Sequence, residues 1–186
     1  MSYTISIIHA RLYAALLTNQ PGLSILNKVI FENNMLSVSV DKLKYLKLHQ
    51  KNGGVVIIPS FKNKYAIIHH SRSGEVLYEF PRGFLEFGET HLTGGERELK
   101  EELNLESSNS YLLGQLLTDS GLISDNIQAI LCEIDDISHL SLQINEGIMD
   151  CKFHSREEIF NMIKQDLIKD NFTLSSFLLL IAKTSD

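Results

Sequence analysis

Glutamates crowd one short stretch of the chain, GFLEFGETHLTGGERELKEEL, at residues 83–103. Glu101 and Glu102 follow Glu98 by three and four residues, which is the repeat of a helix. At about 100° per residue, a helix that begins at a Thr90 N-cap gathers these three carboxylates within an arc of roughly 100°. Like charges at these spacings repel each other, and they repel more where water is partly excluded. We therefore expect positive charge in the space that the three side chains face.

That positive charge can come from basic side chains or from hard divalent cations, which prefer oxygen ligands. Arg97 and Lys100 are the basic residues of this helix, and Arg97 can pair with Glu89 or Glu98. One guanidinium does not neutralise three carboxylates, and this favours a metal ion. A solvated acidic face is the alternative interpretation.

Two glycines in the same stretch weigh against a plain solvated face. Gly94 and Gly95 lie inside the predicted helix, where each glycine costs about 1 kcal/mol relative to alanine. A surface helix gains nothing from that loss. We interpret the missing side chains as space for a bulky ligand, such as a metal-bound phosphate, against the helix backbone.

The elements around the acidic stretch must hold it in place. Leu92, Leu99 and Leu103 fall together on another side of the helix, so we expect them to pack on a core. Short alternating or β-branched runs predict strands within residues 24–33, 35–48, 53–61, 64–71, 75–80, 110–118, 126–134 and 148–153. The first two, around Asn33-Asn34, would form either a hairpin or two successive strands. Strands, then a helix, then strands, then helices is the order of a mixed α/β sandwich and not of an alternating βαβ fold.

Two helices are predicted to close the chain. Ser155 and Glu158 form the S-x-x-E pattern of a capping box, and either Asp170 or Asn171 can cap the second helix. The residues expected on their core-facing sides are Ile159, Met162 and Ile163 in the first helix, and Leu174, Phe177, Leu178 and Ile181 in the second.

The N-terminal residues 3–18 have the apolar repeat of an amphipathic helix, ended by Pro21-Gly22, and lack the basic leader of a signal peptide. This helix could cover an edge of the fold, contribute to a dimer or bind a partner. The apolar run FLLLIA near the C-terminus is far shorter than the roughly 20 residues that span a bilayer. We expect no transmembrane segment.

The composition narrows the class of partner. A net charge of -6 argues against nucleic acid and anionic membrane surfaces, because both need clustered Lys and Arg. Cys132 and Cys151 lie far apart without the spacing of a zinc site or a disulfide framework. We expect buried thiols in a cytoplasmic protein.

With these residues in view, the stretch resembles the Nudix box, G-x5-E-x7-R-E-U-x-E-E-x-G-U, where U is a bulky aliphatic residue. The match runs from Gly83 through Glu89 to Arg97-Glu98-Leu99-Lys100-Glu101-Glu102-Leu103-Asn104-Leu105. Its one departure is Asn104 in place of glycine. Asparagine is the next-best residue for the left-handed conformation that ends a helix, so we expect the loop to be kept.

The resemblance implies an α/β/α sandwich with a mixed sheet and, in this chain, an added N-terminal helix. It also implies a hydrolase of nucleoside diphosphates linked to another moiety, which uses Mg²⁺, or alternatively Mn²⁺. By position, Glu98, Glu101 and Glu102 would be metal ligands, with the carbonyl of Gly83 as a further ligand. Glu89 and Arg97 would be the pair that orients the loop and the helix.

Beyond the box, residues 24–182 resemble the ADP-ribose pyrophosphatase-like branch of this family. The segment EFPRGFLEFGET places Glu79 at the first glutamate of that branch's E-L-P-A-G element. Glu146 occupies a loop position where the branch often has a glutamate that assists the metal-bound water, although a plain loop carboxylate is the alternative. The resemblance implies cleavage of ADP-ribose to AMP and ribose 5-phosphate by a homodimer.

At several positions this chain differs from the motifs of the branch, and these differences bear on which substrate is accepted. Where the branch has R-Q-x-R, this chain has His69-His70-Ser71-Arg72, so Arg72 alone remains as a phosphate or ribose contact. The two histidines could replace the hydrogen bonds of an arginine or be structural. Ser120 occupies the position where the branch has a marker proline. Arg82 could reach a phosphate or simply be exposed.

The expected organisation is an N-terminal extension at residues 1–48 and a Nudix domain at residues 49–186. An active hydrolase is the favoured function, with ADP-ribose, another nucleotide sugar or a dinucleotide as substrate. A Nudix-fold binding or regulatory module without catalysis is the alternative. Such a module should have lost box carboxylates, and this chain retains all of them.

Overall fold

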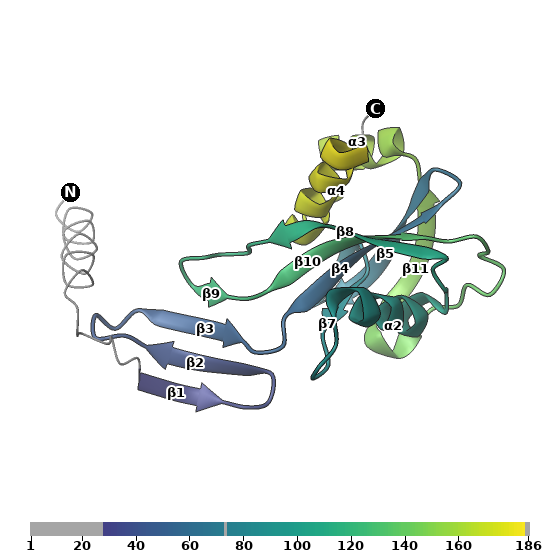
Figure 1. The fold of residues 1–186 in the computed structure, drawn as a ribbon. Coiled ribbons are helices and arrows are strands. Elements are labelled where there is room, and N and C mark those ends of the chain that lie inside the picture. Colours follow the sequence, from purple (N-terminus) through teal and green to yellow (C-terminus); the bar gives the residue numbers. More distant parts are fainter. Residues whose placement is uncertain (1–27, 73, 185–186) are drawn as a thin grey trace. The chain divides into compact units, whose positions relative to one another are not determined.

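The computed structural model of the chain describes residues 28–72 and 74–184 (Figure 1). The chain divides into two units, one formed by residues up to 51 together with 119–124, and one formed by residues 52–118 and 125 onward. We call them the N-terminal unit and the main unit. The predicted helix at residues 3–18 lies outside the described residues.

The described part of the N-terminal unit is a four-stranded sheet in the order β1-β2-β3-β9. Its strands are β1 (Lys28–Glu32), β2 (Leu36–Val40), β3 (Leu46–Gln50) and β9 (Ile123–Ser124). The Asn33 side chain accepts hydrogen bonds from the amides of Met35 and Leu36, at 2.9 and 2.8 Å, which closes the turn between β1 and β2. The hairpin at Asn33-Asn34 is confirmed, but the run predicted at residues 35–48 is divided between β2 and β3.

The main unit contains a mixed sheet with the strand order β11-β5-β4-β10-β8, to which β6 and β7 add beside β5 and β4. The bounds are β4 (Gly54–Phe61), β5 (Lys64–Arg72), β6 (Glu75–Glu79), β7 (Arg82–Phe84), β8 (Asn109–Leu116), β10 (Ile127–Glu133) and β11 (Ile148–His154). Strand β10 runs parallel to β4, and its pairing with β8 is antiparallel. The sheet is therefore mixed, as predicted.

Helices cover both faces of this sheet (Figure 1). Because side chains alternate along a strand, Val55 and Ile57 of β4 pack toward α2 (His91–Leu103), whereas Val56 and Ile58 pack toward the other face. There they meet α3 (Arg156–Lys164) and α4 (Asn171–Thr184). The predicted α/β/α sandwich is confirmed.

Local signals set the helix ends where the sequence places them. Thr90 caps α2 through a capping box with Thr93, and Asn104 ends it in the left-handed conformation at φ 54°. Ser155 forms the predicted box with Glu158. For α4 the cap is Asp170, whose carboxylate accepts from the Thr173 amide at 2.8 Å.

A few expectations differ from the structure. Leu178 of α4 is exposed and not core-facing, whereas Phe177 is buried. Cys132 is buried but Cys151 is only partly buried, and both are free thiols. Across residues 28–72 and 74–184, no helix is long and apolar enough to cross a membrane.

Candidate active site

Strand β7 brings the start of the acidic stretch against its helix. Gly83 pairs with Val55 of β4, and a β-carbon at Gly83 would overlap the carboxylate of Glu98. Only glycine permits this approach, because every other side chain would displace Glu98. The Gly83 backbone and the Glu98 carboxylate therefore lie side by side, as a shared role at one ligand requires.

Arg97 is the charge centre of the box. Its Nε and Nη2 donate to the two carboxylate oxygens of Glu89, at 2.8 and 3.0 Å, and Nη2 also donates to the Phe84 carbonyl at 2.9 Å. Its Nη1 donates to Glu98 and Glu101, at 2.9 and 2.8 Å. These hydrogen bonds raise the pKa of Arg97 and lower that of Glu89. Arg97 thus ties the loop before α2 to the helix.

Of the three candidate metal-ligand glutamates, Glu102 is the one for which no contact with Arg97 is found among the described residues. It is 3% exposed, and its Oε2 has no hydrogen-bond partner among the described residues. Burial, reinforced by the nearby Glu98 carboxylate, raises the pKa of Glu102 to about 8. Burial also raises the pKa of Glu98. A buried carboxyl group without a partner is a position that a cation would stabilise.

The donor set at this position fits a hard divalent ion. The carboxylates of Glu98, Glu101 and Glu102 and the carbonyl of Gly83 would supply oxygen ligands only, which Mg²⁺ and Mn²⁺ prefer. Within the part of the chain that the structure describes, no three acidic, histidine or cysteine side chains already form a metal-ligand cluster. Glu98 and Glu101 are turned onto Arg97 here.

The two helix glycines do not leave the space that we expected for a ligand. A β-carbon at Gly94 would overlap Leu85, and one at Gly95 would overlap Ile130, and both glycines are buried. The prediction of a phosphate space there is wrong. The glycines instead let α2 pack closely on the sheet and on the loop beside it, and this packing offsets their low helix propensity.

The predicted substrate residues meet at a buried carboxylate on β6. Glu79 is 0% exposed, and its Oε1 accepts from Arg72 Nε at 2.7 Å. Its Oε2 lies 3.4 Å from Nη2 of Arg82, which is also 3.7 Å from Asp170. Glu79 is therefore placed to orient the two arginines, and both arginines keep exposed surface.

Glu146 lies in the loop before β11, at the end of a short 3₁₀ helix (Ile144–Glu146), and its side chain is exposed. Gln143 donates to its carboxylate at 3.2 Å. Its charge contributes to the raised pKa values of Glu98 and Glu102, after burial as the main cause. The structure thus brings Glu146 within electrostatic range of the box.

The two adjacent histidines of β5 point to opposite faces of the sheet, as strand alternation requires. His69 lies 3.6 Å from Asp150 and packs edge-on against Tyr78. His70 turns toward the site, where its Nε2 is 2.8 Å from the Glu146 carbonyl oxygen and its Nδ1 is 2.9 Å from Glu79. The sequence did not reveal this contact, because the spacing of 76 residues between His70 and Glu146 carries no local signal.

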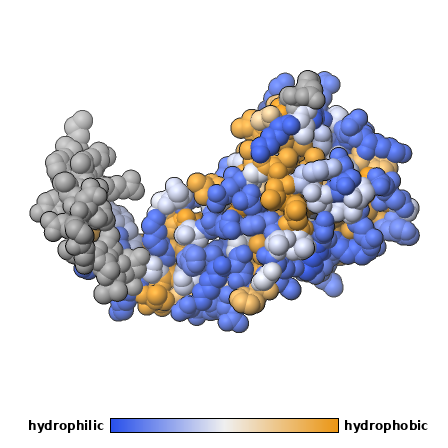
Figure 2. All heavy atoms as spheres, viewed as in Figure 1, coloured by the Kyte–Doolittle hydropathy of each residue, from blue (hydrophilic) through white to orange (hydrophobic). Residues whose placement is uncertain are grey.

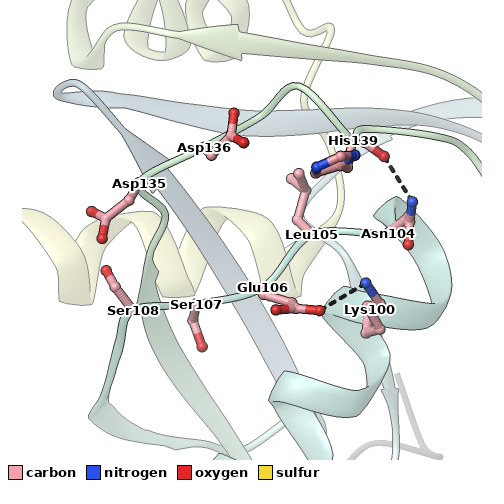
Figure 3. Close-up of a pocket in the computed structure, with 9 residues that line it drawn as sticks. All are labelled: Lys100, Asn104, Leu105, Glu106, Ser107, Ser108, Asp135, Asp136 and His139. Atoms are coloured by element: carbon pink, nitrogen blue, oxygen red, sulfur yellow. Dashed lines mark hydrogen bonds and ion pairs between the residues drawn. The ribbon is translucent and has the colours of Figure 1, made fainter.

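A separate hollow of about 590 Å³ lies at the C-terminal end of α2 (Figure 3). It is lined by Lys100, Asn104, Leu105, Glu106, Ser107, Ser108, Asp135, Asp136 and His139. Lys100 pairs with Glu106 at 2.9 Å, and the Asn104 side chain donates to the His139 carbonyl at 2.8 Å. None of the predicted site residues lines this hollow.

Comparisons with known proteins agree with the geometry. The family model of the NUDIX domain matches residues 49–173, more than half of the chain. Among solved structures, the crystal structure of an ADP compounds hydrolase has a similar fold, with a TM-score of 0.67 over 87% of this chain and 95% of that one, at 15% sequence identity. No curated protein sequence matches this chain. The matched residues contain the whole acidic box, and the chain belongs to the Nudix family of pyrophosphohydrolases.

Proposed function

We propose that this protein hydrolyses ADP-ribose to AMP and ribose 5-phosphate with Mg²⁺, or alternatively Mn²⁺, at the Glu98, Glu101 and Glu102 cluster. The observation that carries the proposal is the buried, unpartnered Oε2 of Glu102 beside two further carboxylates. When bound, the ion would offset the charge of the pyrophosphate, lower the pKa of water and stabilise the leaving phosphate.

The residues of the chain have separate roles in this proposal. Glu98, Glu101 and Glu102, with the Gly83 carbonyl, hold the metal. Arg97 and Glu89 fix the loop that carries Gly83 against the helix, through the short contacts described above. A loop fixed in this way lowers the cost of assembling the site at each turnover.

Substrate contacts would come from the two arginines that pair with Glu79. Arg72 and Arg82, oriented by Glu79, are placed to bind phosphate or ribose oxygens, because a guanidinium matches two oxygens at once. Glu146 would accept a proton from the attacking water at its carboxylate. It is exposed and close to the box, as such a base must be.

Two alternatives are weighed against ADP-ribose. Another nucleotide sugar or a dinucleotide would be cleaved by the same chemistry. Such a substrate is compatible with His69-His70, which stand in place of the branch's arginine and glutamine. The fold neighbour is described as an ADP compounds hydrolase, and this favours an adenine nucleotide. An inactive binding module is disfavoured because the box keeps every carboxylate.

We also propose a cytoplasmic homodimer in which the N-terminal unit takes part, with residues 49–186 as the catalytic domain. Support comes from β1, where Val29, Ile30 and Phe31 are all exposed although they are large and apolar. Other apolar side chains reach the surface over α4 in the main unit (Figure 2). Two free thiols suit a reducing compartment.

The test is product analysis over a substrate panel of ADP-ribose, other ADP- and GDP-sugars, diadenosine and reduced-nicotinamide dinucleotides and nucleoside triphosphates. Each is incubated with Mg²⁺, with Mn²⁺ and with chelator. AMP and ribose 5-phosphate from ADP-ribose, with metal only, is the expected result. Cleavage of another member would keep the chemistry and change the substrate. No cleavage by folded protein with either metal would favour the binding module.

A further inference from the structure

The loop at residues 143–147, which we call the Glu146 loop, is attached to the rest of the site at both ends. At its start, the Gln143 amide donates to the Glu102 carbonyl of α2 at 3.1 Å. At its end, the Ser71 amide of β5 donates to the Gly147 carbonyl at 2.8 Å. Between them, His70 contacts the Glu146 carbonyl oxygen at 2.8 Å.

The chemistry of this contact fixes the ring of His70. A carbonyl oxygen can only accept, so Nε2 must carry the proton and donate it. Nδ1 lies 2.9 Å from the buried Glu79 carboxylate, without the alignment of a hydrogen bond. Glu79 is itself held by Arg72. The ring, almost fully buried, is thus confined between a fixed carboxylate and the loop.

Gly147 allows this close approach. Its φ of +91° is in the left-handed region, and a β-carbon there would lie 2.9 Å from the Ser71 carbonyl oxygen and 3.4 Å from the His70 ring. A larger residue would push the loop away from β5. The glycine, the histidine and the Ser71 amide therefore act on the same few backbone atoms next to Glu146.

We propose that His70 is a positioning residue that holds the Glu146 backbone so that the Glu146 carboxylate faces the box glutamates. This rests on the proposed role of Glu146 as the proton acceptor. His70 touches neither substrate nor metal in this proposal. It acts through one hydrogen bond to a main-chain oxygen, and its buried ring is confined between the loop and Glu79.

A matched pair of substitutions separates the hydrogen bond from general packing. His70→Gln can place an amide nitrogen near the position of Nε2, whereas His70→Asn reaches only the position of Nδ1. A displacement of about 1 Å can cost on the order of 100-fold in rate. We expect His70→Asn to lower kcat by about 10- to 100-fold with KM changed less than about twofold, and His70→Gln to recover most of that loss.

Hydrogen exchange gives a readout that does not need activity. The amides of Glu146 and Gly147 donate within the loop, to Gln143 and Ile144. We expect them to exchange at least about tenfold faster in His70→Asn than in His70→Gln, because the loop loses its attachment. Gly147→Ala is the second variant, which loosens the same loop without altering the histidine, should His70→Asn fold poorly.

A double variant tests whether His70 acts through Glu146. In a Glu146→Gln background, His70→Asn should cost less than about threefold further in kcat, since residues that act as a unit are not additive. Two results would overturn the proposal. One is equal kcat and equal exchange rates in His70→Asn and His70→Gln. The other is that His70→Asn lowers kcat as much in the Glu146→Gln background as in the wild type. Absence of hydrolysis in the wild type would refute the proposed function, while the exchange experiment would still decide the attachment of the loop.

Discussion

Within the box, different nitrogen atoms of the Arg97 guanidinium bind two separate sets of partners. Nε and Nη2 bind Glu89 and the Phe84 carbonyl, and these contacts shape the loop before α2. Nη1 alone binds Glu98 and Glu101. A cation bound by those two carboxylates would replace only the Nη1 contacts, so the loop can keep its form while the ligands turn. The Oε2 atom of Glu102 has no hydrogen-bond partner among the described residues, so it can bind a cation without first breaking a contact.

The first prediction concerns Glu102. Glu102→Gln should lower kcat at least about 100-fold, because it removes a metal-binding charge while keeping the shape. Glu101→Gln should act similarly. In chelator, Glu102→Gln should not lower the melting temperature, because the raised pKa keeps this buried carboxyl group mostly neutral and its Oε2 has no hydrogen-bond partner to lose.

The matched control is Glu106→Gln, an exposed carboxylate that pairs only with Lys100 among the described residues. It should keep kcat within about twofold, because exposed pairs contribute little. Steady-state kinetics and melting curves with and without Mg²⁺ make the comparison. Near wild-type turnover for Glu102→Gln, with an unchanged Mg²⁺-induced melting shift, would remove the metal assignment.

At the scale of elements, the packing of α2 depends on a glycine. Gly95→Ala gains about 1 kcal/mol of helix propensity but adds a methyl group against Ile130 and Val55 in a filled core, which typically costs about 1–3 kcal/mol. We expect a net loss in the free energy of unfolding. Ile130→Val removes the Cδ1 atom that the new methyl would overlap. The double variant should therefore lose less free energy of unfolding than the two single variants lose in sum. Additive values from urea denaturation would contradict this packing account.

Local signals made the helices and most strands predictable. The features that the sequence did not predict are very short or depend on tertiary contacts. The caps at Thr90 and Ser155 and the leucine spacing of α2 act within a few residues of the chain. Strand β7 was missed because three residues carry too little periodicity. Gly95 was misinterpreted because the residue that packs on it, Ile130, is far away in the sequence.

The same distinction holds for the candidate site. Helical period was enough to predict that the box carboxylates share one side of α2, where Arg97 now joins Glu98 and Glu101. The link between Glu79, His70 and Glu146 depends on the register of β5 against β6 and β11. No pattern in a single sequence states such a register, so this part of the site needed the structure.

At the scale of the whole molecule, global unfolding should control thiol chemistry. Burial raises the pKa of Cys132 to about 11 and that of Cys151 to about 12. Since the thiolate is the reactive form, iodoacetamide at pH 8 should modify both cysteines far more slowly in the native protein than in urea. Mass spectrometry of timed samples measures this. Equal rates in both conditions would show that the sheet opens locally around these strands.

The last prediction concerns assembly through β1. Phe31 is 52% exposed on a strand whose other large apolar side chains, Val29 and Ile30, are exposed as well, and a second copy would remove this surface from water. Light scattering after gel filtration should give about twice the 21.0 kDa of one chain. Phe31→Asp should shift the mass to that of the monomer, because a charge cannot be buried there without a partner. Phe87→Asp changes a phenylalanine that is 97% exposed in the main unit, and it should leave the mass unchanged. A monomeric wild type, or a dimer that persists in Phe31→Asp, would show that β1 does not hold two copies together.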